Sequence, residues 1–299
     1  MNKIITEIRL WQKRRNAVIL SHNYQPAEIQ DIADFLGDSL DLSRKAAESD
    51  AGVIVFCGVR FMAETAKILS PKKMVLLPDL EAGCPLADMV TPEDIRKCRR
   101  EHPEAVVVTY INSSVEVKAE SDYICTSSNA LRLVKALPDK TILFFPDQNL
   151  GDFIQSRIEE KMLLWPGYCP THMVFLPEEL TALKKKSPGA VLMVHPECRR
   201  EVRQIADLTL STGGMVKWVK ENSPKEVIVG TETGMINRLK RENPNIHYIP
   251  GSERAVCPNM KKITLEKVLW SLQELQPKIE IPEESAQKSR LALERMLQY

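Results

Sequence analysis

The amino-acid sequence predicts an α/β protein with three similar three-layer αβα domains in a pseudo-threefold arrangement around a central cavity. The main observation is an internal repeat of about 85 residues, in which a Cys-Pro pair recurs at Cys84, Cys169 and Cys257. In addition, short runs rich in Val, Ile and Leu alternate with helical patterns. This alternation is typical of parallel strands covered on both faces by helices.

Four further positions recur in the same register without gaps. A Glu follows each Cys by nine residues, an Asp marks the second unit of each copy, a hydroxyl residue follows that Asp by five, and a hydrogen-bonding ring precedes it by twelve. By copy they are Glu93, Asp34, Ser39 and His22; Glu178, Asp122, Ser127 and Tyr110; and Glu266, Asp207, Thr212 and His195. Chance does not place four registers together, so we expect these residues to have equivalent places in three similar units.

The elements follow in order along the three copies. Copy one is expected to contain strands at Ala17–His22, up to Ser39, at Val53–Cys57 and at Met74–Leu77, with helices over Glu28–Phe35 and Leu40–Glu48. Copy two is expected to contain strands at Ala105–Tyr110, Tyr123–Thr126 and Thr141–Phe145, and copy three at Ala190–His195, Leu208–Leu210, Val227–Gly230 and His247–Ile249. A final helix near Glu284–Gln298 is expected to pack on copy one beside the amphipathic N-terminal helix. The predicted domains are therefore 1–99 with 273–299, 100–185 and 186–272.

Composition narrows the class of function. The 299 residues are 43% hydrophobic and 27% charged, with a net charge of +1, which is ordinary for a globular protein and favours neither nucleic acid nor an anionic membrane as partner. No apolar run approaches the roughly 20 residues that span a bilayer, and the N-terminus lacks the pattern of a secretory signal. Seven cysteines, an odd number, argue against a disulfide framework. We expect a cytoplasmic location.

Polar residues follow the strands at the ends where open α/β sheets bind ligands. The first strands run into His22-Asn23-Tyr24, Tyr110-Ile111-Asn112 and His195-Pro196-Glu197, and the second strands into turns with Ser39, Ser127 and Thr212. Such strand-to-helix turns present N–H groups and a hydroxyl to an anion. A single His or Tyr at a strand end is more often structural, but Glu197 at the tip of an apolar strand needs a partner or a task. The shared register predicts one site for a small molecule with several anionic groups.

The three repeated cysteines have two interpretations. They are either a recurring turn with a buried thiol, or three ligands of Zn²⁺ or of an iron–sulfur cluster. Three thiolates on a four-iron cluster would leave one iron open to act as a Lewis acid. Cys57, Cys98 and Cys125 lie in predicted strands and a helix, and Cys198 has no equivalent in the other copies, so these four are left outside the cluster.

At these residues the chain resembles the quinolinate synthase family, the A protein of NAD biosynthesis in bacteria and archaea. The resemblance runs from about residue 4 to the C-terminus, in the segments SHNYQPAEIQDIADFLGDSLDLSRKA, YINSSVEVKAESDYICTSSNA, HPEC, STGGM, GTETGMINRL and AVCPNMKKITLE. It implies condensation of iminoaspartate with dihydroxyacetone phosphate to quinolinate, phosphate and two waters.

The resemblance also implies roles for individual residues. It places a [4Fe–4S] cluster on Cys84, Cys169 and Cys257, and substrate carboxylates on a set comprising His22, Ser39, Tyr110, Asn112, Ser127 and Thr212. It assigns His195 and Glu197 to the same site and Tyr24 to proton transfer. The residues themselves leave open a zinc-dependent lyase or hydrolase, a non-catalytic iron–sulfur sensor, and a transient contact with the enzyme that produces iminoaspartate.

Overall fold

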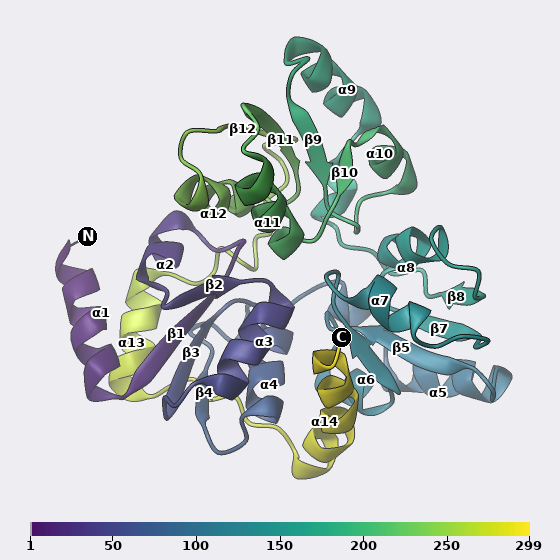
Figure 1. Cartoon of the computed structure of the whole chain (residues 1–299). Coiled ribbons are helices and arrows are strands. Elements are labelled where there is room, and N and C mark those ends of the chain that lie inside the picture. Colours follow the sequence, from purple (N-terminus) through teal and green to yellow (C-terminus); the bar gives the residue numbers. More distant parts are fainter. Residues whose placement is uncertain (1) are drawn as a thin grey trace.

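The computed structural model describes residues 2–299 and contains three parallel four-stranded sheets, each formed by one copy of the repeat (Figure 1). The strands of the first sheet are β1 Ala17–His22, β2 Phe35–Gly37, β3 Val53–Cys57 and β4 Met74–Leu76. Those of the second are β5 Val106–Tyr110, β6 Tyr123–Cys125, β7 Ile142–Phe145 and β8 Met162–Leu164. Those of the third are β9 Val191–Val194, β10 Leu208–Thr209, β11 Glu226–Gly230 and β12 His247–Pro250.

The three sheets have one topology. Their orders are β2-β1-β3-β4, β6-β5-β7-β8 and β10-β9-β11-β12, so the first strand of each copy is always the second in the sheet. The two central strands consist almost wholly of buried apolar residues, as expected for sheets with helices on both faces. The α/β class and the three sheets predicted from the sequence are therefore confirmed.

The helices connect the strands in chain order. Those of the first two copies are α1 Asn2–Arg14, α2 Ala27–Ile32, α3 Ser39–Glu48, α4 Arg60–Leu69, α5 Pro92–Glu101, α6 Val115–Ala119, α7 Ala130–Lys135 and α8 Gln148–Gln155. The later ones are α9 Pro177–Lys186, α10 Arg200–Ile205, α11 Thr212–Asn222, α12 Gly234–Glu242, α13 Leu265–Glu274 and α14 Glu283–Leu297. Glu93, Glu178 and Glu266 lie in the first turns of α5, α9 and α13, where a negative charge is favourable.

The repeated Asp is a structural device. Oδ2 of Asp34 accepts a hydrogen bond from the Ile19 backbone N–H at 2.7 Å. Asp122 and Asp207 make the same bond to the N–H groups of Val107 and Leu192, both at 2.8 Å. In each copy the bond fixes the entry of the second strand beside the first.

Three expectations need correction. The predicted helix over Glu28–Phe35 ends at Ile32, because Asp34 is bonded to Ile19 and pulls the following residues into β2. Strand β8 was not foreseen, since its three residues directly precede the loop that leads to Cys169. The final helix does not pack beside the N-terminal one: α1 packs on α13, whereas α14 lies against α4, α6 and β6, between the first two sheets (Figure 1).

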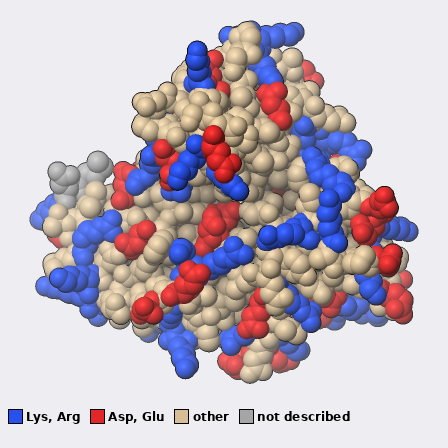
Figure 2. Space-filling view, in the orientation of Figure 1, with Lys and Arg blue, Asp and Glu red and all other residues tan. Residues whose placement is uncertain are grey.

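Charged side chains of both signs are interspersed over the face shown in Figure 2, in keeping with the small net charge. Within residues 2–299, no helix combines the length and apolar character needed to cross a bilayer.

Candidate active site

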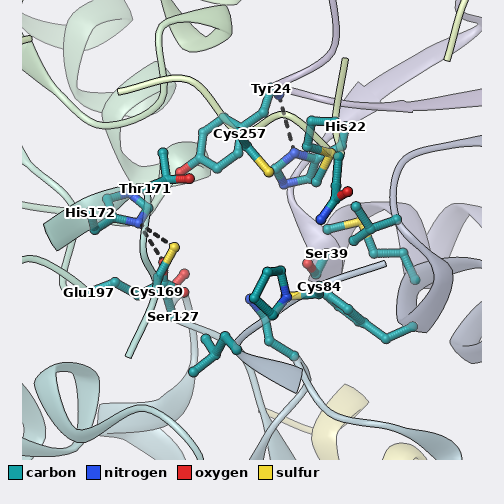
Figure 3. Close-up of a pocket in the computed structure, with 18 of the residues that line it drawn as sticks. His22, Tyr24, Ser39, Cys84, Ser127, Cys169, Thr171, His172, Glu197 and Cys257 are labelled. Atoms are coloured by element: carbon teal, nitrogen blue, oxygen red, sulfur yellow. Dashed lines mark hydrogen bonds and ion pairs between the residues drawn. The ribbon is translucent and has the colours of Figure 1, made fainter. Parts of the chain in front are cut away.

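A cavity of about 160 Å³ lies where the three copies meet, and every site residue predicted from the sequence lines it. Figure 3 shows part of this lining, including the three repeated cysteines. The predicted residues are His22, Tyr24, Ser39, Cys84, Tyr110, Asn112, Ser127, Cys169, His195, Glu197, Thr212 and Cys257. They come from the carboxyl ends of strands in all three sheets and from the three Cys-Pro loops. The other cysteines, including buried Cys198, do not line it.

One backbone hydrogen bond places each cysteine loop. The third residue after the end of β3, β7 or β11 donates its backbone N–H to the carbonyl oxygen two residues before the cysteine. These bonds are Arg60 N to Ala82 O at 2.8 Å, Gln148 N to Gly167 O at 2.8 Å, and Thr233 N to Ala255 O at 2.9 Å. As a result, three loops far apart in sequence direct their sulfur atoms toward one cavity (Figure 3).

Burial keeps the three thiols neutral. It raises the pKa of Cys84 to about 12 and also raises the pKa values of Cys169 and Cys257. The neighbouring thiols raise these pKa values further, because two thiolates would repel each other. Cys257 has this effect on Cys84, and Cys84 has it on Cys169. A metal that binds here therefore has to displace the thiol protons.

The two histidines at strand tips are neutral and share one arrangement. Nδ1 of His22 accepts the backbone N–H of Tyr24 at 3.2 Å, and Nδ1 of His195 accepts that of Glu197 at 3.3 Å. Burial lowers both pKa values to about 3. Since Nδ1 is an acceptor in each ring, the proton belongs on Nε2, which leaves an N–H donor on each histidine; that of His195 lies 3.3 Å from Ser127 Oγ.

The three hydroxyl residues lie where second strands pass into helices. Ser39 and Thr212 are the first residues of α3 and α11, and Ser127 lies between β6 and α7. Asn23 Nδ2 donates to Thr212 Oγ1 at 3.0 Å, which orients this hydroxyl. Hydroxyl and N–H donors from three directions suit a ligand with more than one carboxylate.

His172 is a site residue that the sequence did not reveal. Its Nδ1 lies 2.7 Å from Glu197 Oε2 and 3.2 Å from Cys169 Sγ, and its Nε2 lies 2.8 Å from Thr231 Oγ1. Thr231 Oγ1 is in turn 2.6 Å from the Tyr24 hydroxyl. A continuous series of hydrogen bonds thus links Tyr24 with Glu197.

The reason for missing His172 lies in the repeat. It follows Cys169 by three residues, but the equivalent positions hold Ala87 and Met260. The repeat indicates only residues that recur in all three copies, and this histidine occurs in one copy. Its position in a Cys-Pro-Thr-His segment beside a predicted ligand was the available signal.

Glu197 is an ionised carboxylate in the wall of the cavity. Burial alone would raise its pKa, but His172, His195 and a hydrogen bond from Tyr110 outweigh it and lower the value. The phenols of Tyr24 and Tyr110 stay protonated, because burial and then the charge of Glu197 raise their pKa values. The cavity therefore combines the ionised Glu197 with several neutral donors, which is a suitable arrangement for general acid–base chemistry.

The cavity also contains a group that could hold a single metal ion. Among residues 2–299, Cys169, His172 and Glu197 form the one set of three whose ligand atoms all lie within 4.8 Å of one another. The three repeated cysteines do not form such a set, so at least one pair of their sulfurs is further apart.

A carboxylate, neutral imidazoles, phenols and thiols that could hold a metal surround one cavity, and together they define an enzyme of the acid–base class, built on three α/β units. Comparison with known proteins identifies the family. The family model described as "Quinolinate synthetase A protein" matches residues 6–298, and the chain belongs to this family.

Curated relatives cover nearly the whole chain. A "Quinolinate synthase" of Dehalococcoides mccartyi (strain ATCC BAA-2100 / JCM 16839 / KCTC 5957 / BAV1) is 55% identical over 286 residues, which is 96% of this chain and 95% of the relative. One of Thermodesulfovibrio yellowstonii is 49% identical over 298 residues, covering 99% and 98%. "Quinolinate synthase 1" of Methanosarcina acetivorans is 48% identical over 294 residues, covering 98% and 97%.

Proposed function

We propose that this enzyme condenses iminoaspartate with dihydroxyacetone phosphate to form quinolinate, phosphate and two waters, a step of NAD biosynthesis. The observation that carries the proposal is the convergence of all twelve predicted residues on one cavity, in a chain that belongs to the quinolinate synthetase A family. Joining the two substrates requires carboxylate binding, proton transfer between carbon and oxygen, and loss of two hydroxyl groups. The cavity supplies groups for each requirement.

The substrate carboxylates are assigned to the donors at the strand ends. Ser39, Ser127 and Thr212 provide hydroxyls next to helix starts, and the imidazoles of His22 and His195 provide neutral N–H donors. Tyr110 and Asn112 complete the set on the second copy. Asn112 Oδ1 is buried without a partner, so a donor on the ligand can satisfy it.

Proton transfer is assigned to Glu197, Tyr24 and the residues between them. Glu197 is the ionised base, and His195 lies beside it, with Nδ1 3.6 Å from Oε2. A proton taken up by Glu197 can pass through His172 and Thr231 to the Tyr24 oxygen, because each neighbouring pair is within 2.8 Å. For the protons to balance, Tyr24 first gives its own phenol proton to a leaving oxygen, and the proton from Glu197 then replaces it on the phenolate.

The cofactor in this proposal is a [4Fe–4S] cluster on Cys84, Cys169 and Cys257. Two observations support the fit. All three thiols line the cavity, and their sulfurs do not share the 4.8 Å spacing. Sulfurs around one zinc ion lie only ~3.8 Å apart, given a Zn–S distance of about 2.3 Å. A cluster with one iron free of protein ligands supplies a Lewis acid for the dehydrations.

The finer architecture is part of the same proposal: three domains, 1–99 with 273–299, 100–185 and 186–272, related by a pseudo-threefold axis. Equivalent side chains support it. Gln30, Lys118 and Arg203 each donate to the carbonyl of the residue five positions earlier. Each also contacts the next copy: Gln30 donates to Gly234 O, Lys118 stacks on Phe61, and Arg203 pairs with Asp152. The contacts run from copy one to three, three to two, and two to one.

We place the enzyme in the cytoplasm, with two small molecules as its substrates. Because iminoaspartate is unstable, we also propose a transient contact between this enzyme and the enzyme that produces iminoaspartate. Neither nucleic acid nor a membrane is required.

The test is an anaerobic assay of the reconstituted protein beside its Cys84→Ala, Cys169→Ala and Cys257→Ala variants. Quinolinate formation and cluster absorbance near 400 nm are expected in the parent and lost in each variant. Cys198→Ala is the matched control, since Cys198 is buried near the site but does not line the cavity, and it should keep both. A colourless parent that makes no quinolinate contradicts the proposal.

A second candidate is a zinc-dependent lyase or hydrolase, which the group of Cys169, His172 and Glu197 favours. It would bind one ion per chain, and His172→Ala would abolish that binding while Cys84→Ala would not. Metal analysis of the active protein distinguishes the two: about four irons support the cluster, and one zinc supports this alternative.

A further inference from the structure

Glu232 is a fully buried carboxylate that the proposed mechanism does not use. It follows β11, the strand that leads into the third copy's part of the cavity. Its Oε1 accepts the backbone N–H of Cys257 at 3.1 Å, and its Oε2 accepts that of Gly234 at 2.7 Å. The carboxylate therefore bonds directly to the backbone of one predicted cluster ligand.

Lys261 extends this contact to another copy of the repeat. Its Nζ lies 2.8 Å from Glu232 Oε1 and donates to the backbone carbonyl oxygen of Tyr24 at 2.5 Å. One ion pair thus connects the Cys257 loop of copy three with the Tyr24 loop of copy one. The Glu232 side chain is fully buried, whereas that of Lys261 is 26% exposed, so loss of the lysine would leave a buried carboxylate without compensation. The pair therefore keeps both loops in a fixed relation.

The equivalent positions in the other copies show that the ion pair is specific to copy three, whereas a carboxylate near the cysteine backbone is shared with copy two. Asp147 occupies the same place after β7, where its Oδ1 accepts the Leu150 N–H at 2.7 Å. Burial and the charge of Glu197 raise its pKa, and it has no lysine equivalent to Lys261. Copy one has Val59 there.

Gly234 leaves the space that the pair occupies. A Cβ at this residue would lie 2.7 Å from Tyr24 O, 2.8 Å from Glu232 Oε2 and 2.9 Å from Lys261 Nζ. Real Cβ atoms do not approach so closely, so even alanine would push the three groups apart. The contact thus depends on glycine as well as on the two charges.

We infer that Glu232 and Lys261 are positioning residues, which together set the place of the Cys257 ligand relative to Tyr24. The inference rests on the proposed function, because that function makes Cys257 a cluster ligand and Tyr24 a proton donor. Glutamine cannot replace Glu232, because one of its two terminal atoms is a donor that would face an N–H or the ammonium group. Hydrogen bonds behind metal ligands commonly tune the affinity of the metal in this way.

The first experiment measures the contact without relying on turnover. Hydrogen–deuterium exchange of the holoenzyme is compared in Glu232→Gln, Lys261→Met, Gly234→Ala and Arg254→Gln. About tenfold faster exchange is expected in residues 22–26 and 255–260 of the first three variants, because local opening becomes easier. Arg254→Gln is the control: Arg254 lies in the Cys257 loop and pairs with Glu179 of α9 at the surface, so its loss should change neither segment.

The second experiment separates positioning from general stability. Lys261→Met is expected to lower kcat about tenfold with little change in KM, and Glu232→Gln to release iron to a chelator about tenfold faster. Both are expected to unfold at a lower temperature than Arg254→Gln, because each leaves a buried group without its partner, so kcat and iron release are measured at a temperature where all variants are folded. The double variant should be no worse than the worse single variant. Additive effects, or exchange and iron release equal to the control, overturn the inference. If the parent makes no quinolinate while the exchange result holds, the proposed function fails and the positioning pair stands.

Discussion

His172 Nδ1 lies 2.7 Å from Glu197 Oε2, and both side chains are buried in the wall of the cavity. His172 comes from the loop after Cys169, and Glu197 from the tip of β9, so the contact joins the second copy to the third. The imidazole is oriented from its other side by Thr231. A carboxylate held by an oriented imidazole is a common arrangement for a base that must receive and return a proton.

Glu197→Gln should lower kcat by about 100-fold or more, because the amide cannot accept the proton and the loss of a positioned base costs 10²–10⁴-fold. Iron content should remain that of the parent, since the substitution leaves all three thiols in place. Steady-state kinetics with parallel iron analysis tests this. Near-normal turnover in a variant with an intact cluster would remove Glu197 from its proposed role.

The repeat made the central site predictable from the sequence. Side chains that follow parallel strands converge at one end of a sheet, and shared register extended that rule across three sheets. It identified His22, Tyr110 and His195 as equivalent without any knowledge of their contacts. The same logic could not reach His172, whose equivalents are Ala87 and Met260.

The sequence repeat does not reveal equivalent positions that are filled by different residue types with the same hydrogen-bonding role. Gln30, Lys118 and Arg203 each have a hydrogen-bond donor at the end of a long side chain, but they are three different residue types. The place of α14 was missed for a different reason. An amphipathic helix has an apolar face, but its pattern does not specify which of several apolar surfaces it covers.

Lys118 predicts a pH dependence of stability. It is fully buried, and burial lowers its pKa from 10.5 to about 8. Between these values the unfolded chain holds a proton that the folded protein has released, so this group makes the folded state more stable as pH rises. Its contribution is complete above pH 10.5 and is lost as pH falls through 8, with a slope of at most about 1.4 kcal/mol per pH unit.

The measurement compares the parent with Lys118→Met, which lacks the titrating group. Thermal unfolding of both proteins is followed at pH 7.5, 8.5 and 9.5. The difference in midpoint, parent minus variant, should increase with pH. A constant difference would show that Lys118 titrates as it does in water.

The bond from Asp122 to the Val107 N–H predicts a stability effect separate from activity. Asp122→Ala leaves this buried N–H without its acceptor, and a hydrogen bond to a charged group contributes about 1.5–3 kcal/mol. The unfolding midpoint should fall, while kcat of the folded enzyme is retained because Asp122 does not line the cavity. Asp50→Ala, at an exposed position, is the matched control. Equal midpoints for the two variants would contradict the structural role of the repeated Asp.

Gly167 predicts how tightly the Cys169 loop packs. A Cβ at this position would lie 2.4 Å from the backbone oxygen of Pro146, and backbone cannot move aside as a flexible side chain can. The equivalent positions carry Ala82 and Ala255, so the close approach is particular to copy two. Gly167→Ala should therefore displace Cys169, lower the iron bound per chain and lower the unfolding midpoint. Gly189→Ala, where a Cβ meets open space, should change neither quantity. If Gly167→Ala binds as much iron as Gly189→Ala and unfolds at the same temperature, the loop is free to shift and its backbone bond to Gln148 does not fix the ligand.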